Sequence, residues 1–301
     1  MTQTLSDNLA DPKCEFCHGG GYLRREGSDI APIDIETCRC VRRRQAIIET
    51  ARRLIYADLP GVYAEAEIDK LEEGEGKVQV FDRDRNRMVE RPRAEIDREN
   101  KDNLRMLASS RLGIGQNVIL VGPPGVGKTY GAAALLREQI RRYGVRGYYI
   151  TSHRYILTMR PDQATGEEQQ KLRRLCATVD ILMLDDLGIE KNSAATMREL
   201  LYLIDERTKN GLPTIVTSNL RMSEVFGAKP GASAASADTR EAYDIGARIY
   251  SRFKEGRQII EWPEASADFR DELYRRSQAG RTMATSRVER AKARQLEEGE
   301  I

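Results

Sequence analysis

Residues Gly122 to Thr129 read GPPGVGKT, and this stretch decides the fold. It follows a short apolar run, NVILVG at 117–122, and precedes helical periodicity from about Lys128 to Tyr143. A buried strand, a glycine-rich turn and a helix are the context in which such a loop holds phosphate, because its N–H groups and the helix N-terminus attract anions. The predicted nucleotide-binding residues are Gly122, Pro123, Pro124, Gly125, Val126, Gly127, Lys128, Thr129 and Tyr130.

Two side chains of this loop have predicted roles. Lys128 is expected to reach the β- and γ-phosphates of ATP or ADP. The Thr129 hydroxyl is expected to ligate Mg²⁺. The alternative is a glycine-rich turn that only starts a helix, and the flanking strand and helix argue against it.

Polar residues end two further predicted strands. Asp185 and Asp186 follow the apolar run ILML at 181–184, and Asn219 ends the run TIVTSN. Ligands of open α/β sheets bind at the carboxyl ends of strands. We therefore predict that Asp185 holds Mg²⁺ through water, that Asp186 polarises the attacking water and that Asn219 holds this water. Capping of strand ends and turns is the alternative interpretation.

The predicted elements alternate along the chain after residue 115. Short apolar runs at 117–122, 146–151, 180–188, 213–219 and 257–262 are separated by helical stretches, one of them from about Ala194 to Lys209. This alternation predicts an α/β fold with a parallel five-stranded sheet flanked by helices. Further helices are expected near 244–254 and 267–277, a loop at 228–242 and a charged, flexible tail at 280–301.

Four of the five cysteines lie near the N-terminus, as Cys14-x-x-Cys17 and Cys38-x-Cys40. Two close pairs of thiolates can surround a tetrahedral Zn²⁺, which supplies folding energy to a segment too short to bury a core. Because the second pair is unusually tight, His18 is a possible substitute ligand, and unligated thiols are the alternative to a metal site. Cys176, which stands alone, is interpreted as a core thiol.

The order of these motifs resembles that of the DnaC/DnaI-type replicative helicase loaders, a group of AAA+ ATPases related to IstB-like ATPases. The resemblance rests on the phosphate loop, LDDLG at 184–188, TSN at 217–219 and GARIYSRFKEG at 246–256, and it covers roughly residues 57–270. LPGVYAEAEI at 59–68 also resembles the segment that precedes the ATPase domain of that family. The chain is similar to bacterial and phage members.

The resemblance implies an AAA+ P-loop ATPase with little or no helical lid. It assigns Arg252 as the arginine finger for a neighbouring subunit and Arg270 as a sensor in its own chain. Arg248, one helical turn before Arg252, is a competing finger. Because many AAA+ proteins have glutamate where this chain has Asp186, ATP hydrolysis is expected to be slow and to be stimulated by DNA or a partner.

The implied domain organisation has four parts. Residues 1–56 form a zinc module and helix that bind the helicase, 57–110 a connector with a hairpin at 78–90, 111–279 the AAA+ ATPase domain and 280–301 the tail. The implied function is ATP-dependent delivery of a hexameric, DnaB-type helicase to single-stranded DNA, with self-association through the ATPase domains.

Two other functions compete with helicase loading. An IstB-like transposition ATPase shares the ATPase motifs but binds duplex DNA and a transposase, and its usual pattern lacks an N-terminal cysteine cluster. A small-molecule P-loop kinase would need a second substrate pocket and a lid, whereas only one helix is predicted after Trp262. For DNA contact, we predict a patch formed by Arg141, Arg142 and Arg146 with Tyr148, Tyr149 and Tyr155, although strand tyrosines are more often core residues.

Composition and charge bear on nucleic-acid binding, on membrane contact and on location. The 301 residues carry a net charge of +2, so any nucleic-acid patch is local rather than global. The mean hydropathy is −0.58, and no apolar run reaches the length of a membrane helix. With no signal peptide in the N-terminal sequence, a cytoplasmic location without membrane contact is expected.

Overall fold

A computed structural model describes residues 9–28, 31–82, 85–160, 162–188, 193–221, 225–226, 237–254 and 256–263. Among these residues, no helix is both long and apolar enough to cross a membrane. Arg270, the helix expected near 267–277, the tail and any helical lid lie outside the described residues.

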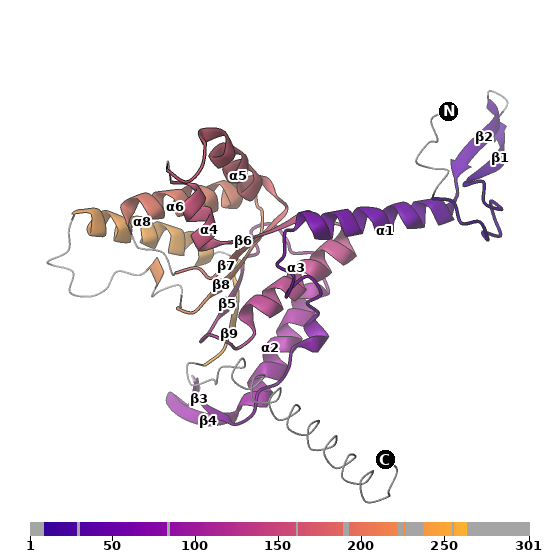
Figure 1. The fold of residues 1–301 in the computed structure, drawn as a ribbon. Coiled ribbons are helices and arrows are strands. Elements are labelled where there is room, and N and C mark those ends of the chain that lie inside the picture. The colour runs from indigo at the N-terminus through magenta and orange to yellow at the C-terminus, as the bar shows by residue number, and fades with distance from the viewer. Residues whose placement is uncertain are drawn as a thin grey trace, which may run out of the picture.

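A five-stranded sheet forms the centre of the fold (Figure 1). Its order is β6-β7-β8-β5-β9, and every neighbouring pair is parallel. The strands are β5 (Val118–Val121), β6 (Gly147–Thr151), β7 (Ile181–Asp185), β8 (Thr214–Ser218) and β9 (Gln258–Glu261). The predicted parallel five-stranded sheet is therefore confirmed.

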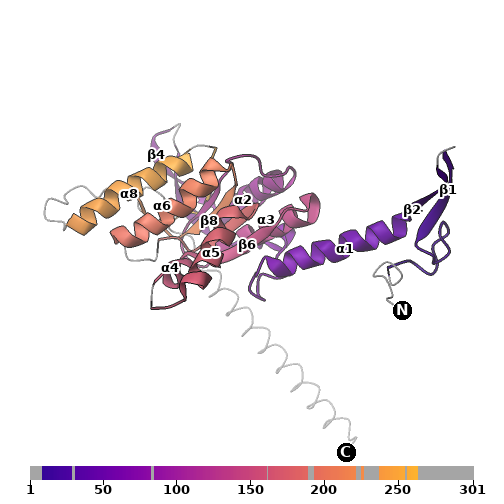
Figure 2. The ribbon, with the colours of Figure 1, turned by 90° about the horizontal axis from the view of Figure 1, so that it is seen from above.

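Helices cover both faces of this sheet, as Figures 1 and 2 show from two sides. One apolar core joins the sheet to the helices α4 (Ser152–Thr158), α5 (Gly166–Thr178), α6 (Ala194–Lys209) and α8 (Ala237–Lys254). The other joins it to α2 (Arg93–Ala108) and α3 (Lys128–Tyr143). Because both faces are buried, β7 is apolar from Ile181 to Leu184 rather than alternating between apolar and polar residues.

The N-terminal part forms an arm (residues 9–56) that projects away from the sheet (Figure 1). Strands β1 (Tyr22–Ser28) and β2 (Ala31–Thr37) pair as an antiparallel hairpin between the two cysteine pairs, and helix α1 (Arg39–Tyr56) follows. Val41 is the buried residue of α1 among those the structure describes, so most of this helix is in contact with solvent.

The segment predicted as a connector contains more regular structure than expected. The hairpin is present as β3 (Lys77–Asp82) and β4 (Arg87–Pro92), and α2 follows it directly. Leu104 and Leu107 of α2 are buried in the same core as α3. Polar residues dominate α2, so its narrow apolar face gave only a weak signal in the sequence.

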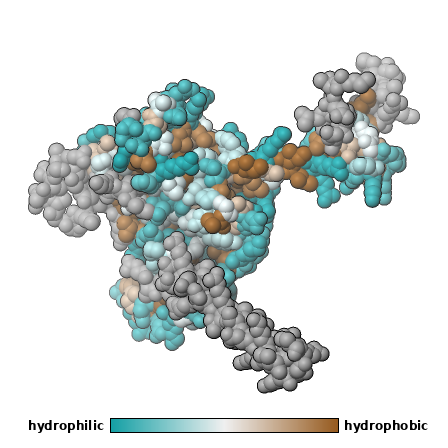
Figure 3. Space-filling view, viewed as in Figure 1, coloured by the Kyte–Doolittle hydropathy of each residue, from teal (hydrophilic) through white to brown (hydrophobic). Residues whose placement is uncertain are grey.

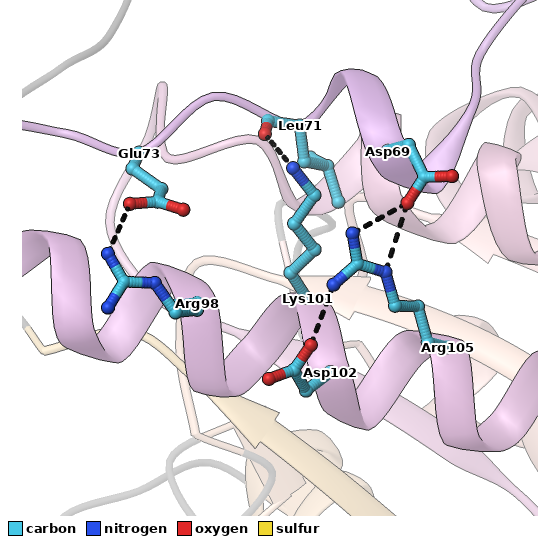
Figure 4. A network of polar contacts seen from close by, with 7 residues as sticks. All are labelled: Asp69, Leu71, Glu73, Arg98, Lys101, Asp102 and Arg105. Atoms are coloured by element: carbon cyan, nitrogen blue, oxygen red, sulfur yellow. Dashed lines mark hydrogen bonds and ion pairs between the residues drawn. The ribbon is translucent and has the colours of Figure 1, made fainter.

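A strap (residues 67–74) containing the short 3-10 helix η1 (Ile68–Lys70) lies along α2 and is held by three cations of that helix (Figure 4). Arg98 pairs with Glu73, and Arg105 pairs with Asp69. The Lys101 ammonium donates to the carbonyl of Leu71 at 2.8 Å. The charged groups of these three α2 side chains therefore hold the strap near both of its ends and in its middle.

One predicted boundary is wrong. Helix α8 begins at Ala237, whereas the sequence placed a loop at 228–242 and a helix only from about 244. The low-complexity composition that predicted a loop extends into the first turns of this helix, where alanine, aspartate and glutamate are compatible with a helical backbone.

A buried arginine joins the strand ends opposite the predicted nucleotide site. Arg207 of α6 is 1% exposed, and its guanidinium donates four hydrogen bonds. The acceptors are the carbonyls of Cys176, Val179 and Pro213 and the hydroxyl of Thr214. Its burial lowers the pKa of Arg207 to about 10, so it remains charged at neutral pH.

We predict that Arg207→Met lowers the free energy of unfolding by about 2–4 kcal/mol, because it leaves buried carbonyls without donors. Urea denaturation followed by circular dichroism measures this. Arg198→Met is the matched control, because Arg198 forms an exposed pair with Glu241 and its loss should cost less than about 1 kcal/mol. Equal destabilisation by both variants would contradict the proposed role of Arg207.

Candidate nucleotide site and cysteine cluster

The phosphate loop lies between β5 and α3, at the carboxyl edge of the sheet. Gly125 and Gly127 have φ angles of 77° and 91°, a conformation that side chains with a Cβ rarely adopt. Gly127 is also the N-cap of α3, so the loop turns directly into the helix N-terminus. The loop borders a cleft of about 650 Å³.

Lys128, Asn219 and Asp186 form a connected row in this cleft. The Lys128 ammonium donates to the Asn219 side-chain oxygen at 2.9 Å and to the Pro123 carbonyl at 2.7 Å. The Asn219 amide in turn donates to the Asp186 carboxylate at 3.1 Å. Three side chains predicted separately from three motifs are therefore in direct contact.

The carboxylate of Asp185 accepts hydrogen bonds from three hydroxyls on three elements. Its Oδ1 accepts from Thr129 of α3 at 2.9 Å and from Thr217 of β8 at 2.5 Å, and its Oδ2 accepts from Tyr149 of β6 at 3.2 Å. Asp185 is 6% exposed. A buried carboxylate needs such donors to remain charged.

The roles of Thr217 and Tyr149 were not predicted from the sequence. Strand β8 lies next to β7 with Val216 opposite Leu184, so the following residues, Thr217 and Asp185, also lie side by side. Tyr149 was assigned to a DNA-binding patch instead. Strand order, which no local motif reports, brings both residues to Asp185.

Asp186 leaves the strand in a left-handed backbone conformation, with a φ of 60°. Its N–H donates to the Thr217 hydroxyl at 2.9 Å, and its carbonyl accepts from the Ser152 hydroxyl at 2.9 Å. Aspartate tolerates this conformation better than most residues. The bend directs Asp186 toward Asn219, while Asp185 stays with the strand.

The donor set fits Mg²⁺. The Thr129 hydroxyl oxygen and the Asp185 carboxylate oxygen lie 2.9 Å apart at the edge of the phosphate loop. Mg²⁺ prefers oxygen ligands, commonly one or two carboxylates together with phosphates and water. These two residues are therefore the ones that would hold the ion.

The strap and the residues before it form the other wall of the cleft, which sequence analysis had placed in a connector. The residues that it contributes, together with one from α2, are Tyr63, Lys70, Leu71, Glu72 and Arg93. The Tyr130 hydroxyl accepts from the N–H of Glu67 at 3.3 Å, so the strap touches the phosphate-loop helix. The resemblance at 59–68 was the one available signal for this wall.

Trp262, the only tryptophan of the chain, packs against the start of the phosphate loop. A Cβ at Gly122 would lie 2.7 Å from the Cβ of Trp262, so only glycine fits here. The Trp262 indole donates to the Asp97 carboxylate at 2.7 Å, and Asp97 also accepts from Arg93. Trp262 is therefore a natural fluorescent reporter of this loop.

The candidate arginine fingers lie outside the cleft of their own chain. Arg252 is on α8 and pairs with Asp205 of α6 at 2.8 Å. Arg248 is exposed one turn earlier on the same helix. Neither residue lines the cleft beside the phosphate loop.

The predicted base-stacking tyrosines are not available to DNA. Tyr148 and Tyr149 are each 8% exposed and Tyr155 is fully buried, so this part of the patch prediction is wrong. Their place in a strand and a helix that are covered on both sides explains the error. Two of the three arginines also have partners, because Arg142 pairs with Glu138 and Arg146 with Asp180.

The four N-terminal cysteines meet at one point. The sulfurs of Cys14 and Cys38 lie 3.7 Å apart and those of Cys17 and Cys40 3.5 Å apart, and all four are within 4.8 Å of one another. Zinc–sulfur bonds of about 2.3 Å in a tetrahedron place sulfurs about 3.8 Å apart. The cluster can therefore hold zinc. The group of ligands consists of the four cysteines, and His18 is not part of it.

Local structure lowers the pKa of one of these thiols. The backbone N–H of Cys17 lowers the pKa of the Cys14 thiol to about 7, which favours the thiolate that metals bind. By contrast, burial raises the pKa of Cys176 to about 12, in agreement with a core thiol. The structure records no disulfide among these five cysteines.

Comparison with known proteins finds relatives of the central region. Residues 94–234 match the family described as IstB-like ATP binding protein, so this region is similar to an IstB-like ATP-binding domain. The α/β fold predicted from the sequence is confirmed by the parallel five-stranded sheet and the helices that cover it. A crystal structure of DnaI shares the fold with a TM-score of 0.50 at 21% identity, covering 68% of this chain and 94% of that one.

Sequence relatives of this central region come from two groups. An insertion-sequence ATP-binding protein of Mycobacterium tuberculosis is 36% identical over 128 residues, which are 42% of this chain and 50% of the relative. One from IS5376 of Geobacillus stearothermophilus is 32% identical over 109 residues, 36% and 42% of the two chains. The replicative helicase loader DnaC of Escherichia coli K12 is 28% identical over 108 residues, 36% and 44%. The chain spans about half the length of these relatives or less.

Metal analysis tests the cysteine cluster. Protein purified without added zinc is expected to contain near one equivalent of zinc, and Cys17→Ala should lose it because three thiolates remain. Cys176→Ala, which removes the buried cysteine outside the cluster, is the control and should keep its zinc. Zinc near zero in the unmodified protein would contradict the site.

Proposed function

We propose that this protein is a Mg²⁺-dependent ATPase that acts as a nucleotide switch in assembling a partner on DNA. The observation that carries the proposal is the contact row from Lys128 through Asn219 to Asp186, beside Asp185, in one cleft. These are the groups that nucleotide hydrolysis requires, at the carboxyl edge of a parallel sheet.

Each residue would contribute a distinct step. The loop N–H groups and Lys128 bind the phosphates, and Thr129 and Asp185 would hold Mg²⁺, which when bound neutralises phosphate charge. Asp186 accepts a proton from the attacking water, and Asn219, bonded to Asp186, orients that water. Aspartate is one methylene shorter than glutamate, which supports a slow reaction.

The finger would come from a neighbouring subunit. Arg252 lies outside its own cleft and is 45% exposed in its side chain, which leaves its guanidinium accessible to another copy. A planar guanidinium is suited to charge on phosphate oxygens. Arg248 is the competing residue, and Arg270 is the proposed sensor.

Mixing two inactive variants tests the shared site. Arg252→Ala lacks the finger and Lys128→Ala lacks the phosphate ligand, so a mixed assembly contains sites that have both residues. We expect mixing to restore part of the ATP hydrolysis rate that each variant lacks. Arg248→Ala in place of Arg252→Ala is the matched control. No restoration under conditions in which the unmodified protein assembles would contradict a shared site.

The finer proposal is loading of a hexameric replicative helicase onto single-stranded DNA. Its support is the arm, whose cysteine cluster the usual IstB pattern lacks, and the similarity to the loader DnaC. Hydrophobic residues gather along α1 in Figure 3, and Ile47 and Ile55 are 60% and 79% exposed. Such a surface is suited to a protein partner.

A second candidate is regulation of a transposase on duplex DNA. It is favoured by the insertion-sequence relatives, which are 32–37% identical to the matched part of this chain, whereas DnaC is 28% identical to it. The ATPase site would be the same in both functions. The two functions differ in the partner that the arm would bind.

Co-purification separates the two candidates. The full chain, loaded with ATP, is mixed with the replicative helicase or with a transposase from the same genome. The loader proposal predicts retention of the helicase and loss of that retention in Ile47→Asp/Ile55→Asp. Glu49→Lys, an exposed change on the same helix, is the control. Binding to the transposase and not to the helicase would reverse the assignment.

A further inference from the structure

Tyr149 connects two parts of the molecule that lie far apart in sequence. Its hydroxyl donates to Asp185, and its backbone N–H donates to the carbonyl of Ala57 at the end of α1. We propose that Tyr149 is a positioning residue, which orients the Asp185 carboxylate for Mg²⁺-bound nucleotide and ties that orientation to the arm. This inference rests on the proposed nucleotide site.

The sheet register places Tyr149 and Asp185 on one face. Tyr149 is opposite Met183 in the β6–β7 pair, and Asp185 is two residues further along β7. Side chains two residues apart in a strand point to the same side. Tyr149 and Met183 both belong to the core beneath α3, so the phenol reaches Asp185 from within this core.

The hydrogen bond from the Tyr149 hydroxyl to Asp185 is buried, because Tyr149 is 8% exposed and Asp185 is 6% exposed. A hydrogen bond to a carboxylate is stronger than one between two neutral groups.

Tyr149 is the donor to Oδ2 of Asp185 among the hydrogen bonds of the described residues. Oδ1 has two donors, Thr129 and Thr217, and Thr129 is also the predicted Mg²⁺ ligand. With Thr129 engaged by the ion, Thr217 and Tyr149 would remain to orient the carboxylate. Loss of Tyr149 would therefore leave one oxygen without its donor.

The other end of the connection is the point where the arm joins the ATPase domain. Ala57 is the C-cap of α1 and is fully buried, and its carbonyl accepts from Tyr149 N–H at 2.8 Å. In the sheet of the described residues β6 is an edge strand, so the Tyr149 N–H lies on the side of β6 that has no neighbouring strand there. The ring of Tyr56 also contacts that of Tyr148, with centroids 6.3 Å apart.

Figure 1 shows α1 running between the β1–β2 hairpin and the sheet, and this helix begins after Cys38 of the cysteine cluster and ends before Ala57. A partner bound along the arm would therefore act on the junction at Ala57. A shift of Ala57 would alter the strand that carries Tyr149. Linkage requires the reverse as well: if Mg²⁺–nucleotide binding depends on Tyr149, it changes the stability of the junction.

Tyr149→Phe removes the hydroxyl and keeps the ring. Tyr148→Phe is the matched control, because Tyr148 is equally buried on the same strand but belongs to the opposite core. Trp262 fluorescence measures ADP binding with and without Mg²⁺. In Tyr149→Phe we expect the Mg²⁺ concentration that gives half of the maximal Mg²⁺ effect on ADP binding to rise roughly three- to tenfold. The affinity for ADP without Mg²⁺ should be unchanged. Tyr148→Phe should match the unmodified protein.

Hydrogen exchange supplies a readout that does not depend on catalysis. In the unmodified full chain, Mg²⁺ with ADP should slow amide exchange at 147–151 and 53–58 more than ADP alone does. Tyr149→Phe should lose this extra protection, and Tyr148→Phe should keep it.

Two results would overturn the inference: an unchanged Mg²⁺ dependence in Tyr149→Phe, or no Mg²⁺-dependent protection of 53–58 in the unmodified protein. The second result needs no variant, so it decides the matter even if Tyr149→Phe does not fold. Failure of the unmodified protein to bind ADP at all would instead contradict the proposed function.

Discussion

The structure depends on a buried negative charge, the Asp185 carboxylate, held by hydroxyls from three different elements. Thr129, Thr217 and Tyr149 can reach it only if α3, β8 and β6 surround β7 in the observed order. A buried charge without these donors would cost several kcal/mol. The polar centre of the site and the topology of the sheet therefore require each other.

Two parts of the chain that precede the phosphate loop are connected to this centre. The strap is held on α2 by three cations (Figure 4), and it forms the wall of the cleft beside the phosphate loop. Ala57, directly after the arm, bonds to Tyr149 of the edge strand β6. Both contacts come from residues before the phosphate loop, so the first third of the chain takes part in building the site as well as preceding it.

Local motifs predicted the parts of the site but not all their neighbours. GPPGVGKT, the paired aspartates and Asn219 each have a chemical signature, and the structure brings them into one cleft. Tyr149 and Thr217 carry no such signature, because their place beside Asp185 depends on strand order. The buried helix α2 was missed because its apolar face is narrow. The start of α8 was misplaced because low-complexity composition resembles that of a loop.

The most direct test of the ATPase account compares Asp186→Asn with the unmodified protein. Single-turnover hydrolysis of Mg²⁺–ATP measures the chemical step, and Trp262 fluorescence measures binding in the same samples. Because Asp186 is assigned to the attacking water and not to the metal, the variant should bind ATP within about twofold and hydrolyse it at least about a hundredfold more slowly. Hydrolysis at the unmodified rate would contradict the account.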